Sequence, residues 1–247
     1  MSAAVIIILV LTGLLVGLLI GAIGVGGVLL VPALVYLADF PVHTAIPACM
    51  AAFMVAGLVG GWAYSRRGSV NWSMAGWLGL GAFPGAYGGA LALSLLSAQL
   101  VLGGIAVMVV IAGIDALRAR AEGRSRTRLS PLALVLTGLV TGTGSALSGT
   151  GGPLILVPIL TWLGLPVLLS VGLGQVIQIP ISLMATIGNL NHGEVDFVLA
   201  GIIALVMMLG ISFGAKLAHS LPAATLRRAV ALMLVVSGCG MLYRVFT

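Results

Sequence analysis

The chain has 247 residues, of which 61% are hydrophobic and only 6% are charged, and its mean hydropathy is +1.27. Soluble domains carry roughly 25% charged residues, so this composition excludes a soluble protein and predicts that most of the chain lies in a bilayer. The formal net charge of +6 comes from basic residues in short loops, where they indicate membrane orientation and not nucleic-acid binding.

Hydrophobic segments recur along the whole chain, and most have the length of about 20 residues that a helix needs to cross a membrane. The first segment lacks the basic flank of a signal peptide, so we expect it to be retained as the first span. Segments 26–38 and 151–164 are shorter, and the sequence leaves open whether they cross fully or form half-helices. In chain order the expected segments are 3–22, 26–38, 44–64, 71–96, 99–117, 130–147, 151–164, 167–188, 195–215 and 226–243.

The two halves of the sequence align when one is shifted by 125 positions, which predicts an internal repeat. Pro41 falls on Pro166, and the stretch 68–72 falls on 193–197. We therefore expect a first transmembrane repeat at 1–117, a basic cytoplasmic linker at 118–129 and a second repeat at 130–247. The glycines of the first half that fall on glycines of the second are Gly13, Gly17, Gly24, Gly26, Gly27, Gly76, Gly85, Gly89 and Gly113.

The distribution of basic residues predicts that the two repeats are inverted. If the two short segments count as crossings, ten of the 11 basic residues lie on one side, and otherwise eight do. The positive-inside rule favours the first arrangement, with both termini outside. Corresponding loops agree, because Arg66-Arg67 corresponds to Asn191-His192 and the uncharged 97–103 corresponds to the basic 222–228. The expected fold is an all-α polytopic membrane protein of two inverted repeats, each with about five segments and a glycine-broken helix near the midplane.

Each half carries a glycine-rich break inside an apolar run, Gly24-Val-Gly-Gly27 in the first and Ser148-Gly-Thr-Gly-Gly-Pro153 in the second. In inverted-repeat transporters such breaks meet at the binding site. Glycine leaves no side chain between backbone and ligand, and proline suits the first turn of the helix that follows. The free N–H groups of that turn favour an anion. The residues expected at the site are Gly24, Gly26, Gly27, Ser148, Gly149, Thr150, Gly151, Gly152, Gln175 and Gln178.

Gln175 and Gln178 lie three residues apart and therefore share one helix face, where the first half has Met50 and Phe53. A buried amide in lipid needs a partner, so these side chains either bind substrate or link neighbouring helices. No span carries a charged residue near its centre, so the anion would be held without a full countercharge. The intramembrane hydroxyls of Thr44, Ser170, Ser182 and Thr186 are expected to bond to backbone carbonyls.

The two glycine-broken hairpins, and above all Ser148-Gly-Thr-Gly-Gly-Pro153, resemble those of the TauE/SafE family, also called the sulfite exporter family. The resemblance covers about residues 8–244. It implies a multi-pass transporter of the bacterial inner membrane that moves sulfite, an organosulfonate or a related small anion, with protons as a candidate coupling ion. The expected inverted repeats separately predict transport by alternating access. The first break lacks the hydroxyls of the second, so the two halves would contribute unequally.

The sequence predicts neither an enzyme nor a metal or cofactor site. The run Ala146-Leu-Ser-Gly149 lacks the first glycine of a rhomboid-type motif, and no histidine lies at the centre of a span. A nucleophile without a base is weak. The alternative functions are an anion channel and an accessory membrane subunit, and a homodimer through a glycine-rich helix face is also expected to be feasible.

Overall fold

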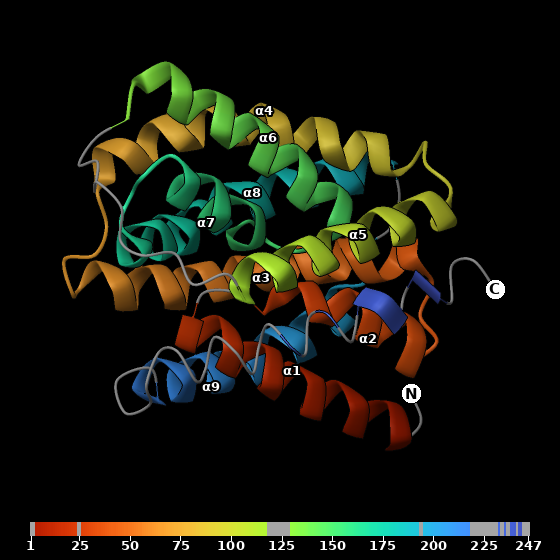
Figure 1. Ribbon diagram of the computed structural model, residues 1–247. Coiled ribbons are helices and arrows are strands. Elements are labelled where there is room, and N and C mark those ends of the chain that lie inside the picture. The colour runs from red at the N-terminus through yellow and green to blue at the C-terminus, as the bar shows by residue number, and fades with distance from the viewer. Residues whose placement is uncertain are drawn as a thin grey trace.

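The computed structural model describes residues 3–23, 26–117, 129–192 and 195–217, and positions 232, 235, 238–240, 242 and 243. Throughout these ranges the chain forms helices and turns, without a strand, as the sequence predicts. The linker at 118–128 and most of the segment expected at 226–243 lie outside the described residues. The elements (Figure 1) are α1 (Ala3–Ile23), η1 (Gly27–Leu29), α2 (Leu30–Leu37), α3 (Val42–Ser65), α4 (Trp72–Leu93), α5 (Ala98–Leu117), α6 (Pro131–Ser148), α7 (Pro153–Trp162), α8 (Val167–His192) and α9 (Phe197–Leu217).

Five of the described helices, α1, α3, α6, α8 and α9, are long and apolar enough to cross a membrane. The helices α2 and α7 are different, because they have only 8 and 10 residues. At 1.5 Å per residue such helices measure about 12 and 15 Å, roughly half of a hydrocarbon core about 30 Å thick. The two short segments are therefore half-helices. Figure 1 shows α2 at the end of the bundle where the N-terminus lies, so α1 and α2 form a hairpin.

The helices pack so that each half of the chain is held by the other. The most extensive pairings are α4 with α6, α1 with α9 and α3 with α8. A shift of 125 positions places α1 on α6 and α4 on α9, so the pair α1–α9 corresponds to the pair α6–α4. The same shift places α3 on α8, so this pair corresponds to itself. This exchange is what a two-fold relation between the halves requires.

Individual glycine contacts repeat with the same shift. A Cβ on Gly142 would lie 2.6 Å from the carbonyl oxygen of Ala82, and one on Gly17 would overlap the carbonyl oxygen of Met207, which is 125 residues beyond Ala82. Likewise, Gly210 packs against the backbone of Leu14 and Gly85 against that of Leu139. Because lipid provides no hydrophobic driving force between helices, such close backbone approach is a main source of their association.

The turns repeat as well. Asn71 caps α4 by accepting a hydrogen bond from the Met74 N–H at 3.1 Å, and Asp196 caps α9 by accepting one from the Leu199 N–H at 2.9 Å. These two cap residues occupy corresponding positions of the halves. Asp39 and Gly164, which also correspond, both adopt the left-handed conformation, with φ of 57° and 90°. These turns of the two halves therefore have the same local structure, not merely similar composition.

The packing glycines generate the first prediction. We expect Gly17→Ala and Gly142→Ala each to destabilise the protein by about 1–3 kcal/mol, because the new methyl group would collide with backbone that cannot move away. Gly76→Ala and Gly201→Ala are matched controls on α4 and α9, since a Cβ there meets nothing within 4 Å. Thermal unfolding in detergent measures the effect. Equal melting temperatures for all four variants would contradict the assigned packing.

Candidate functional site

The second glycine break is a tight turn between α6 and α7 that requires three glycines with positive φ. These are Gly149 at 64°, Gly151 at 80° and Gly152 at 123°. The carbonyl of Ser145 accepts hydrogen bonds from the N–H groups of both Gly149 and Thr150, which ends α6. Pro153 then occupies the start of α7, where its missing N–H costs nothing. Other side chains would strain this turn, which explains the glycine pattern.

Two hydroxyl groups are held together inside this turn. The hydroxyl of Ser148 donates to the carbonyl of Gly144 at 2.7 Å, and its oxygen lies 2.9 Å from the hydroxyl oxygen of Thr150. Both side chains are buried. Among the described residues, no hydrogen bond uses the N–H groups of Gly151 and Gly152. The turn before α7 therefore has backbone donors without a partner.

The first break has a different conformation. Gly26 has a φ of −169°, which is extended backbone, and Gly27 opens the short helix η1. A Cβ on Gly26 would lie 2.7 Å from the Cβ of Leu19, so this break folds back onto α1. Gly24 lies outside the described residues. The two breaks therefore differ in backbone conformation, and an unequal contribution of the halves to a site stays a prediction.

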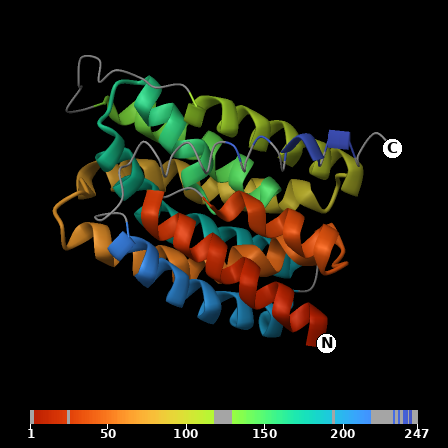
Figure 2. The same cartoon turned by 60° about the horizontal axis from the view of Figure 1, so that its bottom comes forward.

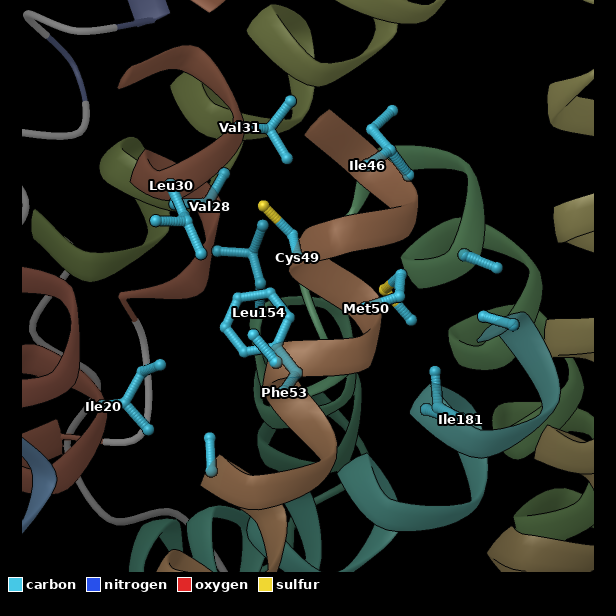
Figure 3. Packing of buried hydrophobic residues seen from close by; sticks show 14 of the residues in the cluster. Ile20, Val28, Leu30, Val31, Ile46, Cys49, Met50, Phe53, Leu154 and Ile181 are labelled. Atoms are coloured by element: carbon cyan, nitrogen blue, oxygen red, sulfur yellow. The ribbon is translucent and has the colours of Figure 1, made fainter. Parts of the chain in front are cut away.

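The two breaks meet at the ring of Phe53, near the middle of α3. A Cβ on Gly27 would lie 2.7 Å from the Cζ of Phe53 and 2.8 Å from the carbonyl oxygen of Thr150. From the other side, a Cβ on Gly151 would lie 3.0 Å from the Cγ of the same ring. Figure 3 shows Phe53 within the buried cluster, between Ile20 and Ile181. The fold therefore brings the two glycine motifs together, as the sequence analysis expected.

Gln178 completes this cluster. Its Nε2 atom would lie 2.6 Å from a Cβ on Gly151, so the amide faces the turn. The side chain is 1% exposed, and within the described part of the chain neither its nitrogen nor its oxygen has a hydrogen-bond partner. A buried polar group without a partner costs about 1–3 kcal/mol. Gln178 is therefore a buried polar side chain that faces the second glycine break and has no described partner.

Gln175 lies close to this cluster, but its amide contacts a different residue. Its amide packs against the backbone of Gly60 on α3, and it is fully buried. Neither amide atom of Gln175 has a hydrogen-bond partner among the described residues. The hypothesis that the two glutamines link helices by hydrogen bonds receives no support from these contacts.

Two expected hydroxyl contacts differ from the prediction. Ser170 donates to the carbonyl of Pro166 at 3.0 Å, as expected of a hydroxyl in a helix. Ser182 and Thr186, however, are buried, and their hydroxyl oxygens have no partner in the described ranges. The default expectation of a bond to a backbone carbonyl is wrong for these two residues.

Several residues of this region escaped the sequence analysis as site members. Phe53 was considered only as the counterpart of Gln178, and the sequence did not distinguish Gly60 from the many other helix glycines. Thr141 and Ser145 on α6 are fully buried, and their hydroxyl oxygens also lack a partner within the described residues. Their spacing of four residues, leading to Ser148, was a signal that could have identified them.

No Lys, Arg, Asp, Glu or His is among the buried side chains that the structure describes. The same ranges contain no group of His, Cys, Asp and Glu side chains that could hold a metal ion. The chemistry available in the centre is therefore that of amides, hydroxyls and backbone N–H groups. Such groups can bind a small polar solute or anion, but they hold no full countercharge.

The sequence is similar to a known protein family and to named proteins of two bacteria. The sequence model described as "Sulfite exporter TauE/SafE" matches residues 9–241. The chain belongs to the TauE/SafE family. A "Probable membrane transporter protein YdhB" of Bacillus subtilis is 27% identical over 243 residues, covering 95% of this chain and 99% of the relative. A "Probable membrane transporter protein" of Haemophilus influenzae is 26% identical, covering 96% of this chain and 97% of the relative. No solved structure matches. The chain is thus a multi-pass membrane protein of a transporter family.

The unpartnered amide of Gln178 generates the second prediction. We expect Gln178→Met to raise the free energy of unfolding by about 1–3 kcal/mol, because a similar volume is kept and an unsatisfied polar group is removed. Thermal unfolding in detergent measures this change. Gln99→Met at the exposed start of α5 is the control. A lower melting temperature for Gln178→Met alone would mean that the amide makes a stabilising hydrogen bond.

Proposed function

We propose that this TauE/SafE family protein is a secondary transporter that exports a small sulfur-containing anion, such as sulfite or an organosulfonate, across the bacterial inner membrane. The observation that carries the proposal is the buried amide of Gln178, which lies beside Gly151 where the two glycine breaks meet. The sulfur oxyanion is suggested by the name of the family, and the geometry supports an anion of that kind.

The site offers hydrogen-bond donors of three kinds. The side-chain donors are the amide N–H groups of Gln178 and the hydroxyls of Ser148 and Thr150, of which the Ser148 hydroxyl must first leave the carbonyl of Gly144. The N–H groups of Gly151 and Gly152 belong to the turn before α7, where the helix dipole favours negative charge. Oxygen atoms of a sulfite or sulfonate group accept hydrogen bonds from all of these donors.

The lack of a buried cation in the described part of the chain favours weak binding of a singly charged anion. Without a countercharge, a dianion would lose far more hydration energy than neutral donors return. A singly charged sulfonate or hydrogen sulfite loses less on leaving water. Weak binding suits a transporter, because the substrate must also be released.

We further propose that the two halves are inverted and that their relative rocking gives alternating access. Figures 1 and 2 support this, because α1 and α6, which correspond in the two halves, run in opposite directions through the bundle. The bias of basic residues between corresponding loops also supports it. This proposal places Arg66 on the cytoplasmic side of the membrane. Its guanidinium carbon lies 4.9 Å from the ring centre of Trp62, an arrangement suited to a membrane interface.

Anion flux into proteoliposomes tests the function. The panel is sulfite, sulfate, sulfoacetate, taurine and a small carboxylate, each with and without a pH gradient. We expect saturable flux of one sulfur oxyanion, with Gln175→Ala and Gln178→Ala reducing it at least tenfold and Gln99→Ala leaving it unchanged. Dependence on the pH gradient would identify protons as the coupling ion.

Other outcomes of the flux assay would point to other functions. Flux that does not saturate and requires no gradient would indicate an anion channel. The absence of flux for every anion, from protein with a normal melting temperature, would contradict the proposed substrate and favour an accessory membrane subunit.

Gly151→Leu tests the position of the site. We expect it to abolish flux, because a side chain there would enter the space of Gln178 and Phe53 and strain a residue with a φ of 80°. Gly76→Leu is the bulk-matched control, since its position on α4 is open. Normal flux through folded Gly151→Leu protein would rule out a site at the second break.

A further inference from the structure

A stripe of buried polar side chains runs along one face of α8 from its middle to its C-terminal end. The spacings of 4, 4 and 3 residues place these side chains on one side of the helix. All of them are at most 8% exposed, and each has at least one side-chain nitrogen or oxygen atom without a partner among the described residues. The stripe consists of Gln178, Ser182, Thr186 and Asn189.

The unpartnered hydroxyls of the stripe differ from six others that the structure describes. Those six, one of which is on α8 itself, donate to a carbonyl three or four residues earlier, at 2.7 to 3.0 Å. That local bond is open to any helical Ser or Thr, and it is the ordinary way to satisfy a hydroxyl in lipid. Ser182 and Thr186 do not make it, and neither do Thr141 and Ser145 on the neighbouring α6. The residues that do make it are Ser94, Thr143, Ser148, Thr161, Ser170 and Ser212.

The length of the stripe matches half of a membrane. From Gln178 to Asn189 the helix rises by about 16 Å at 1.5 Å per residue. Half of a hydrocarbon core about 30 Å thick is about 15 Å. Gln178 lies near the middle of α8, and Asn189 lies three residues before its last residue, His192. A stripe that starts at the middle of the membrane is therefore long enough to reach one membrane surface.

The corresponding face of α3 in the first half has no such polar stripe. Its residues at the matching positions are Phe53, Gly57, Gly61 and Tyr64. A Cβ on Gly57 would lie 3.1 Å from the backbone nitrogen of Ile179, and Gly61 packs against Val176. This face of α3 is thus filled by close packing against α8, and it carries no donor between Phe53 and Tyr64.

We propose that the α8 stripe, together with Thr141 and Ser145 of α6, lines the substrate route between the central site and the membrane face at which α8 ends. The inference rests on the proposed function, which places the substrate at Gln178. Amide and hydroxyl donors about 4.5–6 Å apart along the helix replace successive parts of the hydration shell of an oxyanion. In this structure the stripe is buried, so the route is closed and opens when the surrounding helices move.

Cysteine accessibility tests the route independently of transport. Ser182→Cys and Thr186→Cys are made in a background with Cys49→Ala and Cys239→Ala, which removes the native thiols. The probe is 2-sulfonatoethyl methanethiosulfonate, a charged reagent that does not cross lipid. The protein thiolate attacks its sulfenyl sulfur, which forms a mixed disulfide and releases methanesulfinate. Leu183→Cys and Ile187→Cys on the outer face of the same helix are depth-matched controls, since those side chains are 39% and 38% exposed on the bundle surface.

We expect the probe to modify Ser182→Cys and Thr186→Cys at least tenfold faster than the two controls, and only from the face at which the exposed Asn191→Cys reacts. A transported anion should slow this modification at least threefold. Equal rates at the stripe and control positions, in vesicles where Asn191→Cys reacts, would overturn the route whether or not flux is seen. Rapid modification of the stripe without flux of any anion would support a water-filled route and contradict the proposed substrate instead.

Discussion

The fold depends on one constraint: inside a hydrocarbon layer, every backbone N–H and C=O group must find a partner within the protein. A helix that begins or ends inside the membrane exposes such groups, and the half-helices α2 and α7 each begin at a glycine break. The carbonyl of Ser145 accepts two N–H groups at the second break, Phe53 of α3 contacts both breaks, and Gln178 of α8 contacts the second. The broken hairpins can exist only because intact helices surround them. The centre of the protein is therefore where unsatisfied donors are concentrated.

The surrounding helices are held by glycines at positions that repeat between the halves. Gly142 against Ala82 and Gly17 against Met207 are two versions of one contact. The shell is thus nearly symmetric, whereas the interior is not. Gln178 and Phe53 occupy equivalent positions, and one supplies an amide where the other supplies a hydrophobic ring. A nearly symmetric shell therefore encloses an asymmetric interior.

Much of this arrangement could be predicted from the sequence. The shift of 125 residues identifies the corresponding helices, and the two glycine motifs identify the breaks. The short helices could not be assigned, because hydrophobicity alone does not distinguish a half-helix from a span. The place where the breaks meet could not be predicted either, because Phe53 is an ordinary apolar residue until the three-dimensional contacts of Gly27 and Gly151 are known. The unsatisfied state of Ser182 was equally hidden, since any helical hydroxyl can bond to its own backbone.

The exchanged pairing of α1 with α9 and α4 with α6 has a consequence for the origin of the chain. A half-length ancestor could have buried the same surfaces in a two-fold homodimer, since each half supplies both members of the contact. In such a dimer every substitution appears twice, so an amide at the position of Gln178 would also replace the ring at Phe53. The polar stripe on α8 and the closely packed face of α3 could diverge only after that gene was duplicated. Duplication therefore preceded the present division of roles between the halves.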